Sequence, residues 1–415
     1  MRLITPVALL SLAGVGLADC GVEGGTIVVD NPNGFSILDE LETCSTVYGN
    51  ILIDPAFVYF ILQGPQEITG TITAHDNTIL KFFWLQDVRR LGGLSLANPQ
   101  ISARVNVTAL EEIGTMEWKD IFWHYTDDFF EFHAPNLKKI SSLNVESTDL
   151  SGFAPDYVSW DGSFYYEGLQ KVTTADNIRV VRNRRMDNVV FPALKSISES
   201  LVVADNVNNF PSEGSSSRML ISFPALESVG SVSIYDSRVY RSSLGGKINL
   251  PILSHVFGDF NVSSVKGVRE LAVPALKEVD GSIHVVGNKG LYNLNFPELR
   301  KADRIILEGG NNGFETISFP SLEEVGAFHV SSAARGFDCS SLDYIKKIAT
   351  EFSCSTKNTL PSSWSSFSHV PTPTPSSHVP TSAPSSHSSL PIPTSTRPGG
   401  PVRTCSAFIP NQTAP

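Results

Sequence analysis

Short apolar strands alternate with polar turns along this chain, and the pattern repeats. In the second half each repeat opens with a cassette such as FPALESV or VPALKEV and continues into two apolar residues separated by one outward residue. The prolines of the six clearest cassettes are Pro192, Pro224, Pro251, Pro274, Pro297 and Pro320, and the last four are 23 residues apart. A fixed period of this length predicts a solenoid in which every turn contributes one short strand.

The alternating apolar pairs mark the expected core face of these strands. They are Leu201 and Val203, Val232 and Ile234, Phe260 and Val262, Ile283 and Val285, Ile305 and Leu307, and Phe328 and Val330. One repeat buries too few apolar side chains to offset the entropy of ordering its backbone, so neighbouring repeats must stack and share a core. Weaker versions of the rhythm precede Pro192, as in QEITGTITA, ALEEIGTMEW and APNLKKISSLNV. We therefore expect a mainly β fold, a right-handed parallel β-solenoid that fills most of residues 26–335.

The two ends of the chain differ from the repeats in composition. Residues 1–18 combine Arg2 with an apolar stretch and small residues, which is typical of a secretory signal peptide cleaved between Ala18 and Asp19. No segment is long and apolar enough to predict a transmembrane helix. Ser, Thr and Pro account for 27 of the 40 residues from 361 to 400. Residues 355–415 are therefore expected to form a disordered, O-glycosylated stalk.

Five cysteines fit a secreted protein. Cys20 and Cys44 precede the repeats, and Cys339 and Cys354 follow them. Secretion permits disulfides, so we predict one local pair at each end, where the solenoid would otherwise expose a strand edge and the end of its core. Cys405 is left over as a free or intermolecular thiol. The wide spacing of the cysteines and the lack of a CxxC motif argue against a zinc site.

Three Asn-x-Ser/Thr sequons predict N-glycosylation at Asn106, Asn261 and Asn411. Asn261 lies between the inward residues Phe260 and Val262, so strand alternation points its side chain outward. The same argument applies to Asn106. Glycans at these positions fit a decorated outer surface and cost no core packing. A net charge of −11 disfavours nucleic acid or an anionic membrane as a partner.

Candidate chemistry is sparse. His284 and His329 share the outward column of the last strands, but strands of a parallel coil are about 4.7–4.9 Å apart, so two histidines two turns apart cannot share a zinc ion. We interpret them as isolated exposed histidines and expect no metal and no cofactor. Asp127, Asp128, Asp156 and Asp161 are the carboxylates that a polysaccharide-cleaving coil would use, yet no histidine or arginine constellation accompanies them, which favours solvated loop acids. No nucleophile elbow, phosphate loop or metalloprotease motif occurs.

Two further features leave structural interpretations open. Asparagines that follow strands, namely Asn183, Asn206, Asn288 and Asn311, are interpreted as turn residues that tolerate a left-handed backbone and hydrogen-bond the neighbouring turns. The region 118–166 is rich in aromatic residues, which either fill the core or form an exposed surface that could stack on sugars.

The chain resembles the fungal cell-wall organisation proteins that carry receptor L-domain-like repeats and are often anchored by glycosylphosphatidylinositol. The likeness covers about residues 20–354. It rests on the opening around Cys20 and ILDELETCSTVYGNILI, on the repeats FPALESVGSVSI and VPALKEVDGSIHVVGN, and on the closing DCSSLDYI with Cys354 before the stalk. The resemblance implies two consecutive L-domain-like coils, residues 19–175 and 176–354, and an extracellular location at the cell wall or surface. The chain ends VRTCSAFIPNQTAP rather than in the hydrophobic tail that such an anchor signal needs. Two alternatives follow: the protein is released as a soluble glycoprotein, or the reading frame stops before a missing terminal exon.

These observations predict a secreted, non-enzymatic glycoprotein that contributes to cell-wall organisation and integrity. Its expected partners are wall polysaccharides or wall and surface proteins. The resemblance also supports an alternative, an extracellular ligand-binding module of the receptor L-domain type. A β-helical carbohydrate-active enzyme is the third class, and it would depend on residues such as Asp127 or Asp161.

Overall fold

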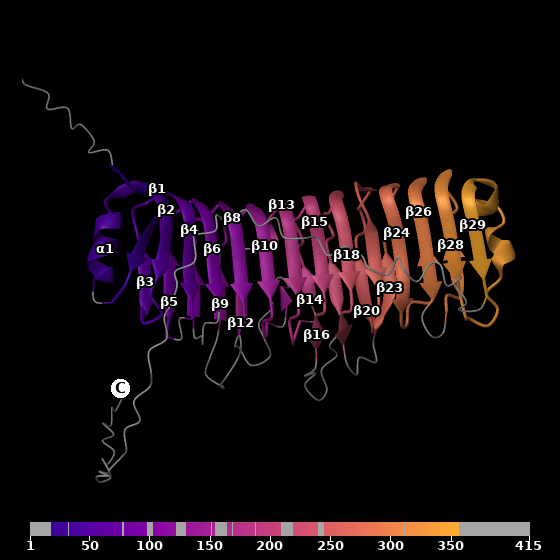
Figure 1. Ribbon diagram of the computed structural model, residues 1–415, viewed down its shortest axis with the longest axis horizontal. Helices are drawn as coiled ribbons and strands as arrows, with labels where there is room; N and C mark the ends of the chain where they lie inside the picture. Colours follow the sequence, from indigo (N-terminus) through magenta and orange to yellow (C-terminus); the bar gives the residue numbers. More distant parts are fainter. Residues whose placement is uncertain are drawn as a thin grey trace, which may run out of the picture. The chain divides into compact units, whose positions relative to one another are not determined.

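The computed structural model describes residues 18–31, 33–76, 79–97, 103–121, 130–150, 152–153, 164–167, 169–186, 188–208, 219–239, 245–309 and 313–356. They form a parallel β-solenoid, as the repeat predicts (Figure 1). One long sheet runs through every turn, and its strand pairs are parallel. Its strands are β1 (Ala18–Val29), β2 (Cys44–Ile53), β4 (Glu67–His75), β6 (Arg90–Ala97), β8 (Glu112–Lys119), β10 (Lys139–Glu146), β13 (Thr174–Val181), β15 (Ser196–Ala204), β18 (Ser228–Tyr235), β21 (His255–Val256), β22 (Phe260–Ser263), β24 (Glu278–Asn288), β26 (Lys301–Gly309), β28 (Glu324–Ser331) and β29 (Ala349–Ser355).

Shorter parallel sheets form another side of the coil. Toward the N-terminus lie β3 (Tyr59–Leu62), β5 (Phe82–Leu85), β7 (Ala103–Asn106), β9 (Phe130–His133) and β12 (Phe164–Glu167). Further along lie β11 (Gly152–Phe153), β14 (Asn188–Val190), β17 (Leu220–Ser222), β20 (Gly246–Asn249) and β23 (Val268–Ala272). Two small pairs complete the set, β16 (Val207–Asn208) with β19 (Arg238–Val239), and β25 (Asn293–Asn295) with β27 (Thr316–Ser318).

One core runs through the coil. All the apolar pairs predicted to point inward are buried, and none of these side chains is more than 1% exposed. The cassettes supply a second layer, because the phenylalanine before the proline and the leucine after it are also buried, as at Phe223 and Leu226. Equivalent phenylalanines stack on neighbouring turns, with ring centroids of Phe191 and Phe223 5.6 Å apart. Stacked aromatic rings gain contact energy beyond their buried area, so the cassette both turns the chain and fills the core.

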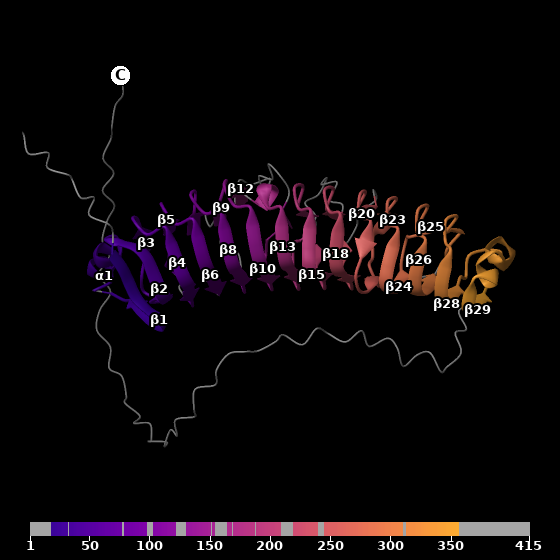
Figure 2. The ribbon, with the colours of Figure 1, turned by 90° about the horizontal axis from the view of Figure 1, so that it is seen from above.

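Each end of the solenoid is closed by a helix and a disulfide. At the N-terminal end α1 (Gly34–Leu41) buries Leu38 and Leu41, and the disulfide between Cys20 and Cys44 joins β1 to β2. At the other end two 3₁₀ helices, Cys339–Leu342 and Ile345–Lys347, precede β29, to which Cys339 is joined through Cys354. Figure 2 shows α1 and β29 at opposite ends of the row of strands. Both predicted disulfides are therefore present, and they tie down the two terminal strands.

Some predictions concern parts of the chain that the structure describes only in part. The expected boundary between residues 175 and 176 falls inside β13, which pairs with β10 and β15, so the long sheet is continuous there. The division into two coils stays a prediction. The signal peptide up to residue 17, Cys405, Asn411 and nearly all of the stalk lie outside the described residues. Within the described residues, no helix is long and apolar enough to cross a membrane.

Candidate functional site

A groove crosses four consecutive turns on the outside of the long sheet. Its volume is about 260 Å³. It is lined by Glu67, Ile68, Thr69, Arg90, Leu91, Gly92, Glu112, Ile113, Gly114, Lys139 and Ser141. These residues come from the first few positions of β4, β6, β8 and β10, so the groove runs across the strands, along the direction in which the turns stack.

The floor of the groove needs small residues. Gly92 and Gly114 are the third residues of β6 and β8, and each lies close to the backbone of the preceding turn. A Cβ atom on Gly92 would overlap the carbonyl oxygen of Thr69, and one on Gly114 would overlap that of Gly92. Glycine is therefore required for close approach of the backbones. Its missing side chain also leaves the space that becomes the groove.

One wall of the groove is a column of charged residues of alternating sign. Glu67, Arg90, Glu112 and Lys139 each begin a strand, and they are register partners on successive turns. The guanidinium of Arg90 donates to the carboxylate of Glu67 at 2.5 Å. That hydrogen bond is the first cause of the raised pKa of Arg90, followed by the charge of Glu67. Two acids and two bases cancel, so the wall offers many hydrogen-bonding groups without a net charge.

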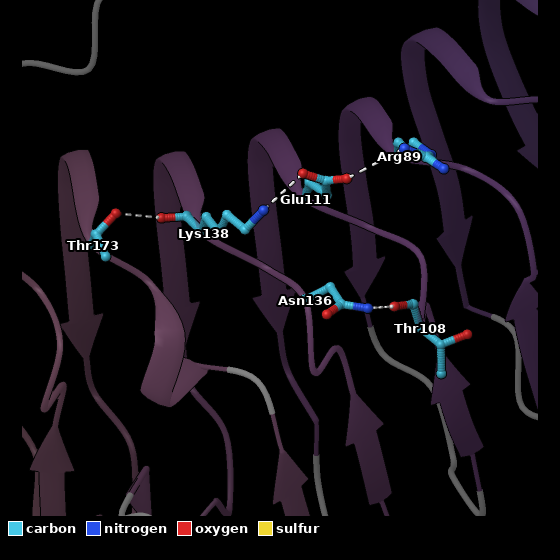
Figure 3. A network of polar contacts seen from close by, with 6 residues as sticks. All are labelled: Arg89, Thr108, Glu111, Asn136, Lys138 and Thr173. Carbon is cyan, nitrogen blue, oxygen red and sulfur yellow. Dashed lines mark hydrogen bonds and ion pairs between the residues drawn. The ribbon is translucent and has the colours of Figure 1, made fainter.

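A second column lies one residue earlier and supports the first (Figure 3). Glu111 accepts a hydrogen bond from Lys138 Nζ at 2.9 Å and lies 3.7 Å from Arg89 Nη1. The hydrogen bond from Lys138 is the main reason that the pKa of Glu111 lies below its usual value. The chain of contacts extends to Thr173, whose hydroxyl donates to the Lys138 carbonyl at 3.2 Å.

A hydrogen bond outside the two charged columns also joins neighbouring turns. Figure 3 shows Asn136 Nδ2 donating to the Thr108 carbonyl, at 2.8 Å, one turn away. Exposed ion pairs stabilise a fold only weakly. Their effect here is to orient side chains beside the groove.

Two of the predicted glycosylation sites, Asn261 and Asn106, lie in the described residues. Asn261 points outward between Phe260 and Val262, as expected, but it is only 3% exposed and its Nδ2 is buried. Asn106 in β7 is half-buried, between buried neighbours. Outward orientation therefore does not by itself expose these side chains. Side chains on adjacent turns are about 4.7–4.9 Å apart, and long neighbours can cover a shorter one. Glycosylation of both residues stays a prediction.

The two histidines lie on one outward column, separated by Ile306. They are two turns apart on this column, as the repeat predicts. The interpretation as exposed side chains was wrong, because His284 is half-buried and His329 is only 7% exposed. Loss of hydration lowers the pKa of both, and the nearby guanidinium of Arg304 adds to that effect.

The predicted loop carboxylates and the aromatic region are the remaining candidates. Asp127, Asp128, Asp156 and Asp161 lie outside the described residues. Of the aromatic region, Trp118 and Phe132 are fully buried, with ring centroids 5.0 Å apart, so these two belong to the core.

The apolar pattern does not predict the groove residues, although the sequence carries a signal for them. The residue before each of the four strands and the first two residues of the strand read QEI, RRL, EEI and KKI, at residues 66–68, 89–91, 111–113 and 138–140. Aligned by repeat, these doublets alternate between acidic and basic character. The apolar residue that ends each triplet is similar in all four, so the apolar pattern does not reveal this alternation. In the comparisons with known proteins, no protein-family model and no solved structure matches the chain.

Proposed function

We propose that this protein is a secreted, non-enzymatic glycoprotein of the cell wall or cell surface that contributes to wall organisation, and that the groove over β4, β6, β8 and β10 binds a neutral wall polysaccharide. The observation that carries the proposal is the groove's direction combined with its cancelling charges. A polymer laid along the groove meets a carboxylate or a cation on every turn. Alternating acceptors and donors suit the hydroxyl groups of a sugar chain, whereas a charged polymer would meet repulsion on alternate turns.

One observation supports the extracellular location. The disulfides at the two ends of the coil fit an oxidising compartment. The wall itself is proposed on the resemblance to fungal wall-organising proteins, whose repeats and cysteine positions this sequence shares. A rigid coil with several weak contact points would hold polymers by multivalency rather than by one tight site.

The test is retention of the full-length secreted protein by insoluble β-glucan, with chitin as a second polymer. We expect saturable retention that changes little with salt. Arg90→Gln together with Glu112→Gln should weaken it, because the first replaces a guanidinium by a shorter amide with fewer donors and the second removes a carboxylate acceptor at unchanged size. Lys301→Gln is the matched control, since Lys301 occupies the same position of its strand outside the groove. It should bind as the unchanged protein does.

Three outcomes would contradict the proposal. Failure to bind any wall polysaccharide, with saturable binding to one protein or peptide instead, would favour the ligand-binding module. Equal loss of binding in the groove variant and in the Lys301 variant would show that the groove is not the site. Turnover of the polymer that is lost on replacing Asp127 or Asp161 would show an enzyme.

A further inference from the structure

A histidine and two carboxylates meet on the outside of the solenoid, away from the groove. His255 is the first residue of β21, and its register partner on the next turn is Glu278, the first residue of β24. Asp280 follows two residues later in the same strand. One ligand atom from each of the three lies within 4.8 Å of the other two. The repeat itself creates this meeting, because positions 255 and 278 are 23 residues apart, one full period.

The geometry of the three groups is close to that of a metal site. His255 Nε2 lies 3.0 Å from Asp280 Oδ2, a separation that two ligands of one ion commonly have. Zinc binds imidazole nitrogen and carboxylate oxygen at about 2.0–2.2 Å in tetrahedral geometry, so ligand atoms on one ion are about 3.3–3.6 Å apart. The pairs that involve Glu278 lie within 4.8 Å, so a side-chain rotation brings them to this spacing. The exposed side chain of Glu278 has the rotamer freedom to do this.

The surroundings hold the imidazole in place. The ring of Phe257 lies 4.2 Å from the imidazole centroid, which restricts its rotation. His255 is 29% exposed at its side chain and Asp280 is 47% exposed, so an ion can reach the ligands and water can complete its coordination.

The charge balance also suits a divalent cation. Two carboxylates and one neutral imidazole carry two negative charges. Lys301 is the next residue of the same column, and its Nζ lies 3.5 Å from Glu324. Lys277, which precedes Glu278, lies 4.0 Å from Glu298. The nearest lysines are thus engaged with other acids.

We propose that His255, Glu278 and Asp280 form a surface site for a first-row divalent cation, for which Zn²⁺ is the probe. Imidazole favours Zn²⁺ over Ca²⁺ and Mg²⁺, which prefer oxygen-only sites. The ion would link β21 to β24 at the turn where the long strand is divided into β21 and β22. This site is independent of polysaccharide binding in the groove.

The experiment is calorimetric titration of Zn²⁺ alone into the full-length, metal-free protein at neutral pH. We expect a saturable site with one ion per chain. His255→Ala, Glu278→Gln and Asp280→Asn should each weaken it by more than about tenfold, since outer-shell partners alone account for about 10- to 100-fold. Glu323→Gln is the matched control, because it removes an exposed carboxylate just before β28, three turns after His255, without touching the three ligands or the pair of Lys301 with Glu324.

Two results would overturn the proposal. The first is the absence of saturable Zn²⁺ binding. The second is binding that survives His255→Ala unchanged, which would place the ion on other histidines. If His255→Ala does not fold, the two carboxylate variants decide the question, because they are conservative changes at exposed positions; unchanged affinity in both would then overturn it. Loss of zinc binding with polysaccharide retention intact would confirm that the two sites are separate.

Discussion

Asn183 and Asn206 form a buried hydrogen-bonded pair across two neighbouring turns of the solenoid. Oδ1 of Asn206 accepts from the backbone N–H of Asn183 at 3.1 Å and from Nδ2 of Asn183 at 2.9 Å, and Nδ2 of Asn206 donates to the Val180 carbonyl at 2.7 Å. Neither asparagine is more than 1% exposed. The left-handed backbone falls on the residue before each one, Arg182 and Asp205. The asparagines thus satisfy backbone groups that the turn would otherwise bury unpaired.

Replacing Asn206 should therefore be costly. We expect Asn206→Ala to lower the free energy of unfolding by about 3 kcal/mol or more, because each buried polar group left without a partner costs about 1–3 kcal/mol. Urea unfolding followed by circular dichroism measures the change. Asn293→Ala is the control, since exposed Asn293 also bridges two turns by accepting from Thr316 at 2.6 Å. Its effect should stay within about 0.5 kcal/mol. Equal effects of the two changes would contradict this role.

Three glycines that lie close to the preceding turn make a graded prediction. A methyl group on Gly92 would overlap the Thr69 carbonyl, and one on Gly230 would overlap the Glu199 carbonyl. On Gly258 it would lie 3.1 Å from the Gly230 carbonyl, which a small shift relieves. We expect Gly92→Ala and Gly230→Ala to cost about 1–3 kcal/mol, as overpacking does, and Gly258→Ala to cost less. Thermal unfolding gives the order of the three stability costs, and an inverted order would show that the backbone at these glycines relaxes freely.

The closing disulfide should protect only its own end of the coil. Replacing both Cys339 and Cys354 with serine should cost about 3 kcal/mol, the typical value for a closed loop of 15 residues. Because each turn contacts mainly its neighbours, backbone amides of β28 and β29 should exchange faster in hydrogen-exchange mass spectrometry while those of β15 keep their protection. Uniform loss of protection along the chain would argue that the solenoid unfolds as one unit.

His329 should make stability depend on pH. Burial lowers its pKa below the usual 6.5, and Arg304 lowers it further, although Glu351 opposes the shift. The unfolded chain then binds a proton at a higher pH than the folded chain does. Stability is therefore complete above pH 6.5, falls as the pH drops toward the lowered pKa, and levels off below it.

Three substitutions test these causes of the pH dependence. His329→Gln should flatten the dependence, and His284→Gln should add to the effect because burial lowers the pKa of His284 as well. Glu351→Gln should extend the decline to lower pH, since it removes the group that raises the pKa of His329. Unfolding midpoints between neutral and mildly acid pH test this. An unchanged pH profile in His329→Gln would refute it.

The fold was predictable because the repeat period can be read from short stretches of sequence, and it determines which residues stack on neighbouring turns. The proline-leucine cassettes and the apolar pairs identified the buried residues, and the cysteine positions identified the ends. The groove and the His255 cluster were harder to predict, because each joins residues from different turns. Pairing His255 with Glu278 requires the exact register of two cassettes. Burial on the outward face, as at Asn261 and His329, depends on the size of neighbouring side chains and is not visible in alternation.

Parallel stacking in a fixed register underlies every column described above. Thr174 and Ser196 are register partners in β13 and β15, on either side of the predicted domain boundary. Neighbouring strands place partner Cα atoms about 4.7–4.9 Å apart. A disulfide joins residues whose Cα atoms are about 4.4–6.8 Å apart, so register partners are within its range. Ser198 lies two residues further along β15, which adds about 6.6 Å along the strand.

The most direct measurement compares two double-cysteine variants by peptide mapping of the oxidised protein. Thr174→Cys with Ser196→Cys should cross-link spontaneously and nearly completely. Thr174→Cys with Ser198→Cys should stay reduced, because the two positions are too far apart. Efficient cross-linking of the second pair, or none of the first, would contradict the register on which the groove, the charged columns and the proposed cation site depend.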